Sequence, residues 1–504
     1  MIRSPVLHAT SRQAGTDTET RRQSRGQNDL ENGAGPDPPV DKLMTFLLFI
    51  FPALGGLLFG YDIGATSGAL VSLKSATSSG TSWYDLTSFQ SGLIVSASLF
   101  GALAGSSAAF VVGDKLGRRK ELILAAVLYG GASVTMGGAT GLCILVLGRA
   151  LYGLGIGFAM HAAPAYIAEA APAKVRGLLI SLKEVLIVVG ILLGYLASYE
   201  FVDTVGGWRI MYGASAVPAL LLLAGMVWLP DSPRWLLLSG ASKARAEQDL
   251  VRARGSRADP AAVQRELAGI ENSVREAKAM ESPGFVGLFK GRYLKPLTVG
   301  TSLMLFQQIT GQPSVLYYAA DIFSKAGFSA GKDSTGVSVI LGFFKLVMTG
   351  VAVLTVEDLG RRPLLLIGVS SMVVSLLALG GSQLVLTGQA ETWTSVAALL
   401  LYVGAYQVSF GPISWLIVGE VFPLAVRGQA GALATVTNFG SNFLVSLVLP
   451  TVQDTFGAGA TYLGFAVIGV AAVATIYAIV PETKGKTLEE IEDLFDLSTD
   501  EKSS

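Results

Sequence analysis

The sequence contains very little cysteine, histidine and charge. Cys143 is the single cysteine, which rules out an internal disulfide, and its apolar surroundings favour packing over reactivity. The chain has two histidines, and no motif in it matches a metal-ligand cluster, a nucleophile with its base or a phosphate-binding loop. A formal net charge of +0 argues against a nucleic-acid partner. We therefore expect no enzyme activity, no metal and no cofactor.

Apolar residues, by contrast, are abundant. They make up 51% of the 504 residues, 60 residues are glycine, and only 15% are charged. A soluble chain of this length would need far more charge on its surface. The composition therefore indicates a multi-span membrane protein surrounded by a lipid bilayer.

Apolar segments recur along the chain after a polar N-terminal region. A helix needs about 20 apolar residues to cross a bilayer. Segments of about this length are expected at 44–73, 88–112, 121–140, 142–165, 176–199, 208–229, 293–322, 334–356, 363–386, 393–421, 428–451 and 458–480. The sequence thus predicts an all-α membrane protein with twelve transmembrane helices in two six-helix pseudo-repeats.

Three charged motifs occur twice in the same order. EAAPAKVRG (169–177) returns as EVFPLAVRG (420–428), which is 251 residues later (420 minus 169). DKLGRRK (114–120) returns as EDLGRRP (357–363), and PDSPRWL (230–236) has a weaker counterpart in PETKGK (481–486). Repeats in a fixed order indicate a duplicated unit of about half the chain.

The charge pattern also predicts orientation and domain limits. Lysine and arginine concentrate in alternate short loops, so the positive-inside rule places both termini in the cytoplasm. The linker between the halves has helical patterns near 241–254 and 261–278, which predict short amphipathic helices under the bundle. The expected units are a disordered cytoplasmic tail (1–42), a first bundle (43–229), a cytoplasmic linker (230–292), a second bundle (293–480) and a cytoplasmic C-terminal tail (481–504).

The repeated acids and bases predict a charge network at the cytoplasmic edge. Carboxylates beside guanidinium groups can hold the halves together on one side and release them during transport. Simple anchoring of the topology is the alternative, although it does not require the acids. The expected network residues are Asp114, Arg118, Arg119, Glu169, Arg176, Arg234, Glu357, Arg361, Arg362, Glu420, Arg427 and, deeper in the second half, Lys345.

Taken together, the motifs resemble the sugar porter family of the major facilitator superfamily, over about Thr45 to Glu490. Within this family, the sequence most resembles the plant-type vacuolar glucose transporters and the D-xylose-proton symporter-like proteins. The motifs that carry the resemblance are GYDIG (60–64), DKLGRRK, GRALYGLGIG (148–157), EAAPAKVRG, PDSPRWL, QQITG (307–311) with Tyr317 and Tyr318, EDLGRRP, GPISW (411–415), EVFPLAVRG and PETKG.

This resemblance implies alternating access around a central sugar site. Amides can both donate to and accept from sugar hydroxyls, and an aromatic face packs on a pyranose. An isolated amide in a bilayer can instead simply join helices, and a lone Trp can simply pack. The implied sugar contacts are Gln307, Gln308, Tyr318, Trp415, Asn438 and Asn442, with Glu184 at a further contact position.

Asp62 and Arg149 are the expected proton-coupling residues. An ionisable side chain inside a span costs at least ~2.5–3.5 kcal/mol on insertion scales, so Asp62 is a functional candidate by itself. The resemblance pairs it with Arg149 of the fourth helix. Burial favours the protonated acid and Arg149 favours the carboxylate, so movement of the arginine could load and release one proton per cycle. A static ion pair that only packs helices is the alternative.

Three residues depart from the family pattern. Pro313 stands where Asn is usual, Glu184 where Gln is usual, and Lys345 where a neutral residue is usual. We expect Glu184 and Lys345 to form a bridge across the seam in one access state. Lys183 is expected to snorkel, and His161 to end the fourth helix on the outer side.

The predicted function is proton-coupled symport of a hexose or pentose such as glucose or xylose. A passive sugar facilitator is the first alternative, because the three altered positions leave coupling open. A transport-inactive sugar sensor is the second, although the tail after Pro481 is short. The expected partners are the monosaccharide and protons, in the plasma or vacuolar membrane, with one chain sufficient for transport.

Overall fold

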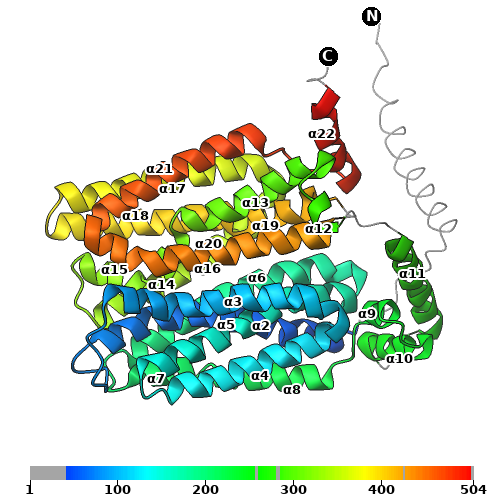
Figure 1. Ribbon diagram of the computed structural model, residues 1–504, viewed down its shortest axis with the longest axis horizontal. Coiled ribbons are helices and arrows are strands. Elements are labelled where there is room, and N and C mark those ends of the chain that lie inside the picture. Colours follow the sequence, from blue (N-terminus) through cyan, green and yellow to red (C-terminus); the bar gives the residue numbers. More distant parts are fainter. Residues whose placement is uncertain (1–40, 256–258, 280–283, 424–425, 501–504) are drawn as a thin grey trace, which may run out of the picture.

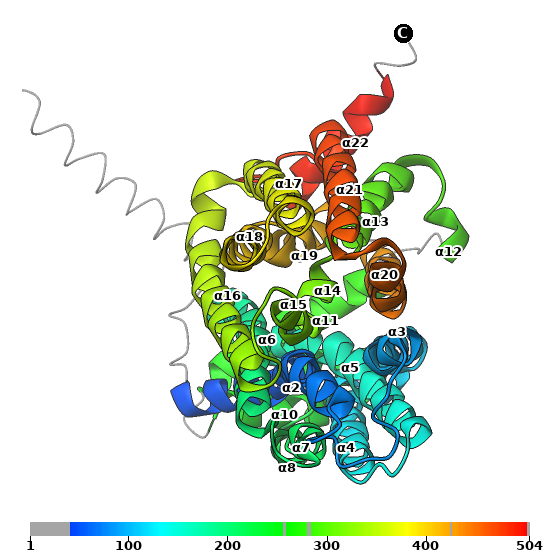
Figure 2. The same cartoon turned by 90° about the vertical axis from the view of Figure 1, so that its left-hand side faces the viewer.

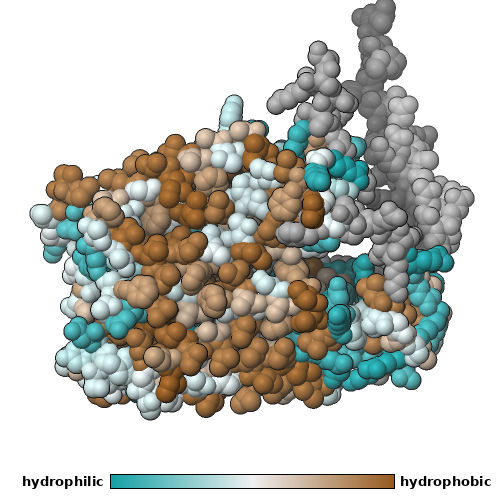
Figure 3. Space-filling model, in the orientation of Figure 1, coloured by the Kyte–Doolittle hydropathy of each residue, from teal (hydrophilic) through white to brown (hydrophobic). Residues whose placement is uncertain are grey.

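The computed structural model describes residues 41–255, 259–279, 284–423 and 426–500. All regular elements in these ranges are helices, and most run along one common axis (Figure 1). Seen along that axis, the helices form two groups, one from each half of the chain (Figure 2). On the face shown in Figure 3, a broad apolar band covers the helices, with polar residues gathered at both ends. This arrangement confirms the all-α membrane fold.

The first half contains six spans. Two of them begin at side-chain caps: Asp41 accepts from the Met44 backbone, and Thr87 forms a reciprocal capping box with Gln90. The helices are α2 (Lys42–Lys74), α3 (Ser88–Leu116), α4 (Arg118–Gly137), α5 (Leu142–Ala170), α6 (Ala173–Phe201) and a divided sixth span, α7 (Gly207–Gly213) with α8 (Ala216–Trp228).

The second half repeats this arrangement with two divided spans. Its helices are α13 (Leu294–Ile309), α14 (Gln312–Tyr317) and α15 (Ala319–Lys325) in the seventh span, then α16 (Lys332–Leu359), α17 (Arg361–Val385), α18 (Gln389–Val408) with α19 (Phe410–Val421), α20 (Arg427–Phe456) and α21 (Ala458–Ile479). Ten helices or helix pairs in the described ranges are long and apolar enough to cross a membrane. The two predicted spans outside that set are α4, which opens with four charged residues, and the broken seventh.

Short helices of the linker and the C-terminus lie at one end of the bundle, which we call the linker end (Figure 1). The other end is called the opposite end. The linker helices pack their own small apolar cluster through Leu236, Leu250 and Leu267. The short helices at this end are α9 (Pro233–Leu238), α10 (Lys243–Arg254), α11 (Pro260–Ala279), α12 (Gly284–Gly287), η1 (Gly291–Tyr293) and, after the last span, α22 (Leu488–Asp500). The predicted N-terminal tail lies almost wholly outside the described residues.

Glycines allow the helices of the first half to pack at very short distances. A Cβ added at Gly60 of α2 would lie 1.8 Å from the Ile187 carbonyl oxygen of α6. A Cβ at Gly153 of α5 would lie 1.9 Å from the Ser98 carbonyl oxygen of α3. Small residues at helix contacts are the usual way in which membrane helices approach each other. These contacts fix the positions of α2, α3 and α5, which carry the buried charges.

Two spans of the second half are interrupted in their middle. The seventh breaks at Gly311, whose φ of +97° favours glycine, and the tenth breaks at Ser409. Breaks of this kind free backbone carbonyls that must find other partners inside the protein. Both breaks lie at the residues predicted to bind sugar.

Candidate functional site

Asp62 and Arg149 meet in the interior of the first half. They are 2% and 0% exposed, and Arg149 Nη1 donates to Asp62 Oδ1. Arg149 also donates to the Ile94 carbonyl at 2.9 Å and to Ser98 Oγ at 2.8 Å, while Ser98 donates to Asp62 Oδ2 at 3.2 Å. Ser98 was not identified from the sequence. The buried acid is therefore neutralised by one guanidinium, and that guanidinium has further acceptors of its own.

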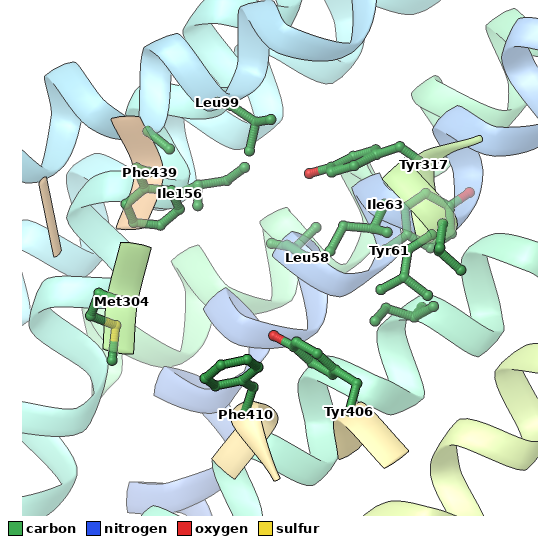
Figure 4. Packing of buried hydrophobic residues seen from close by; sticks show 14 of the residues in the cluster. Leu58, Tyr61, Ile63, Leu99, Ile156, Met304, Tyr317, Tyr406, Phe410 and Phe439 are labelled. Atoms are coloured by element: carbon green, nitrogen blue, oxygen red, sulfur yellow. The ribbon is translucent and has the colours of Figure 1, made fainter. Parts of the chain in front are cut away.

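Aromatic side chains from both halves belong to the buried core of the molecule, among them Tyr61 of α2 and Tyr317 of α14 (Figure 4). The Arg149 guanidinium lies 5.2 Å from the centre of the Tyr212 ring. Tyr317 approaches from the second half, and its buried hydroxyl has no hydrogen-bond partner among the described residues. An unpaired hydroxyl in a dry site is costly, so this one is available to a substrate or water.

Gln307, Gln308 and Asn438 form one amide cluster in the second half. Asn438 Nδ2 donates to Gln307 Oε1 at 2.6 Å, and Gln308 Nε2 donates to the same oxygen at 3.2 Å. Gln307 Nε2 donates at 2.6 Å to the carbonyl of Phe410, the first residue after the break in the tenth span. Gln308 Oε1 is buried without a described partner. The cluster is thus rigid through Gln307 and retains a free acceptor at Gln308.

The remaining predicted sugar residues lie around this cluster with different roles. Tyr318 is buried and donates to the Ser446 carbonyl at 2.9 Å, which joins the broken seventh span to α20. Asn442 accepts from Ser446 Oγ at 3.2 Å. Trp415 is half-buried and packs against the apolar core. In this structure Tyr318 therefore binds backbone, and its hydroxyl proton is already in use.

Glu184 and Lys345 do not form the expected bridge in this structure. Glu184 pairs instead with Lys183 at 3.0 Å. Lys183 is buried rather than extended to the surface, whereas the Glu184 side chain is 43% exposed. Lys345 is 4% exposed, donates to Gln407 Oε1, and lies 5.3 Å from the centre of the Tyr406 ring. A neutral amide gives no charge signal in a sequence, which is why Gln407 was missed.

The charge network at the linker end of the first half joins α3, α4 and α5. Arg118 pairs with Asp114 at 2.9 Å and with Glu169 at 3.5 Å, while Ser232 donates to Glu169 at 2.5 Å. Arg119 caps the end of α8 by donating to the Met226 carbonyl at 2.9 Å. Arg119 also reaches Asp231 in the linker at 3.4 Å. Burial, and after it the Asp231 carboxylate, raises the pKa of Asp249 in α10.

The second half repeats this network almost contact for contact. Arg361 pairs with Glu357 at 3.0 Å and with Glu420 at 3.2 Å, while Thr483 donates to Glu420 at 2.6 Å. Arg362 donates to the Tyr477 carbonyl at 2.7 Å. Ser232 and Thr483 occupy equivalent places in the repeated PDS and PET motifs, and this alignment could have identified both.

Three further predicted network residues behave differently. Arg176 and Arg427 each donate to a backbone carbonyl five residues earlier, Ala171 at 3.4 Å and Phe422 at 3.1 Å. Arg234 is exposed, and no ion pair to it is found among the described residues. The ion pairs of Arg118 and Arg361 each close within one half, so in this state they do not bridge the halves.

Contacts between the halves gather toward the opposite end. The Ala320 N–H donates to Ser67 Oγ at 3.0 Å, and the Tyr195 hydroxyl donates to the Leu316 carbonyl at 2.8 Å. Lys74 faces Asp321 at 3.9 Å. A cavity of about 480 Å³ lies beside these contacts, and the predicted sugar residues are not part of its lining.

His161 lies in the last three turns of α5, toward the linker end, so its predicted outer position was wrong. Its Nδ1 lies 2.8 Å from Oε1 of the buried Glu121 of α4. The error arose because α5 starts at the opposite end and continues to Ala170. Within the described ranges, no group of three or more His, Cys, Asp or Glu residues could hold a metal ion.

Comparison with known proteins identifies a family for most of the chain. The family model described as "Sugar (and other) transporter" matches residues 48–495. The Arabidopsis thaliana protein named "D-xylose-proton symporter-like 3, chloroplastic" is 52% identical over 458 residues, which is 89% of this chain and 82% of the relative.

Solved structures with the same fold are also similar in sequence. The proton:xylose symporter XylE bound to 6-bromo-6-deoxy-D-glucose matches with a TM-score of 0.73 and 31% identity, over 90% of this chain and 100% of the other. The inward open conformation of XylE from E. coli matches with a TM-score of 0.75 and 30% identity, over 89% of this chain and 99% of the other.

Proposed function

The chain belongs to the sugar transporter family, and from this membership we propose that it is a proton-coupled monosaccharide symporter working by alternating access. It is a membrane transporter and not an enzyme. Its substrate is a hexose or pentose, because the similar proteins are named for D-xylose and one was solved with a glucose derivative. Sugar binds at the amide cluster of Gln307, Gln308 and Asn438, with Trp415 and Asn442 beside it.

The Asp62–Arg149 pair is the single observation that carries proton coupling. A buried carboxylate that loses its charge also loses its attraction to the guanidinium. Arg149 would then remain bound to the Ile94 carbonyl and Ser98, so protonation frees Asp62 without leaving a buried cation wholly unpaired. One proton can thus bind and leave in each cycle while the fold stays intact.

The sidedness of the cycle follows from the charge distribution. Arg118, Arg119, Arg361 and Arg362 all lie at the linker end, which is therefore assigned to the cytoplasm together with both termini. The seam contacts at the opposite end, with the TM-score of 0.75 to an inward open relative, support an inward-facing state. A plasma or a vacuolar membrane fits this orientation. One chain contains all the residues required, which supports a functional monomer.

Glu184 and Lys345 exchange partners between the two states in this scheme. Here Glu184 binds Lys183 and Lys345 binds Gln407. In the outward-facing state the two would meet across the seam between α6 and α16. Neutralising each residue and then both should give strongly non-additive losses of transport, and additive losses would contradict the exchange.

Uptake into proteoliposomes with and without a pH gradient tests the symport. A gradient of one unit can drive about tenfold accumulation at one proton per sugar. Asp62→Asn should abolish accumulation while sugar exchange continues, because the sugar cluster lies in the other half. Asp85→Asn, an exposed loop change in the same half, is the matched control. Sugar equilibration without accumulation in the unmodified protein would indicate a passive facilitator instead.

A further inference from the structure

Lys345 is a buried cation without a carboxylate partner among the described residues. An ammonium group has three donors, and one neutral acceptor, Gln407 Oε1, is found for it. Glu184, the acid expected to pair with it, is held by Lys183. A buried charge without an opposite charge is expensive to maintain. This position therefore favours the arrival of an anionic group.

Two other ion pairs of the spans are each neutral by themselves. Asp62 is balanced by Arg149, and Glu184 is balanced by Lys183. Lys345 remains, so these three cations and two anions sum to one positive charge. A neutral sugar leaves this charge in place, whereas a sugar with one carboxylate cancels it.

Lys345 is also next to the amide cluster that binds sugar in the proposed function. Its ammonium lies over the Tyr406 ring at 5.3 Å, and the Tyr406 side chain interacts with Gln307. Figure 4 shows Tyr406 next to Phe410, the residue whose carbonyl accepts from Gln307. A ligand bound to Gln307 and Gln308 could thus place a substituent near Lys345.

We propose that this transporter also takes sugar acids, with Lys345 binding the carboxylate while the amide cluster binds the ring hydroxyls. The inference rests on the proposed sugar site and extends its substrate class. The substrate class is an aldopyranose with a carboxylate at C5, where glucose has a hydroxymethyl group and xylose has hydrogen. The substrate carboxylate competes with Glu184 for Lys345.

Labelled D-glucuronate and D-xylose, compared in proteoliposomes that contain the full chain, test this proposal. We expect the unmodified protein to take up both. Lys345→Met should lower glucuronate uptake relative to xylose uptake about ten- to a hundredfold, which is the range for a lost hydrogen bond to a charged group. Glu184→Gln should increase the preference for glucuronate, because it removes the competing acid.

Charge movement provides a second measurement. One proton with xylose carries one positive charge inward, whereas one proton with glucuronate carries none. An interior-negative potential should therefore increase xylose accumulation and leave glucuronate accumulation unchanged.

Xylose uptake without glucuronate uptake or competition overturns the sugar-acid proposal and leaves the symporter proposal intact. Glucuronate uptake that neither Lys345→Met nor Glu184→Gln alters overturns the role of Lys345. Failure of every sugar to cross overturns both proposals.

Discussion

Tyr195→Phe is expected to shift the protein from its inward-facing toward its outward-facing state. Tyr195 is 0% exposed in α6, and its hydroxyl donates to the Leu316 carbonyl of α14 at 2.8 Å, across the seam between the halves. The substitution removes only this oxygen. In the closed seam the carbonyl loses its partner, whereas in an open seam water would replace it.

The size of the shift follows from the value of one hydrogen bond. A neutral hydrogen bond contributes about 1 kcal/mol net, which corresponds to a change of about fivefold in the ratio of the two states. The effect can exceed this value because the Leu316 carbonyl is left buried and unpaired in the closed state. The rest of the phenolic ring keeps its packing, so the fold should remain intact.

Distances between two spin labels can measure this ratio directly. Cys143→Ser provides a cysteine-free background, since the chain has one cysteine. Labels at Thr77 and Ala330 then report on the seam, because both are exposed and line the same cavity from different halves. Tyr84→Phe, at an exposed tyrosine in the loop before α3, is the control. An unchanged ratio of short to long distances, or more of the short distance, would refute this account of the seam.

Two further changes test the packing and the sugar cluster. Gly60→Ala should prevent stable folding, because the new Cβ would lie 1.8 Å from the Ile187 carbonyl, whereas Gly130→Ala, with open space around it, should yield normal protein by size-exclusion chromatography. Equal yields of monodisperse protein would contradict the packing argument. Gln308→Ala should weaken sugar binding about tenfold by calorimetry, as its free Oε1 is lost, while gradient-driven proton binding at Asp62 is retained. Unchanged affinity would remove Gln308 from the sugar site.

Hydropathy and the repeated motifs predicted the spans well, but they could not predict the breaks. Residues 293–322 and 393–421 were each predicted as one continuous span. The chain nevertheless breaks at Gly311 and at Ser409. The second break is stabilised by Gln307, which donates to the Phe410 carbonyl from 103 residues away. Because that partner belongs to another helix, no local pattern contains the information.

The partners of buried charged residues are equally hard to predict from the sequence. Asp62 and Arg149 each stand out in the sequence as costly inside a bilayer, but their pairing over 87 residues required the family resemblance. Lys345 stood out for the same reason, and its expected partner was Glu184. The structure gives it Gln407 instead, because an amide on the neighbouring α18 is closer than an acid across the seam. Matching charges in a sequence considers only ions, whereas a buried ammonium group can donate to any nearby oxygen.

The two halves can move as rigid bodies because their strongest contacts are internal. Gly117 and Gly360 turn the chain with φ values of +85° and +89°, and each places an arginine against acids of its own half. The seam at the opposite end instead has hydrogen bonds, such as those of Ser67 and Tyr195, and one long, partly exposed ion pair between Lys74 and Asp321 at 3.9 Å. Opening the seam therefore costs about 1 kcal/mol for each bond broken, whereas opening either network would break charged pairs. The cheapest motion leaves both networks intact and separates the halves, which is the motion that alternating access requires.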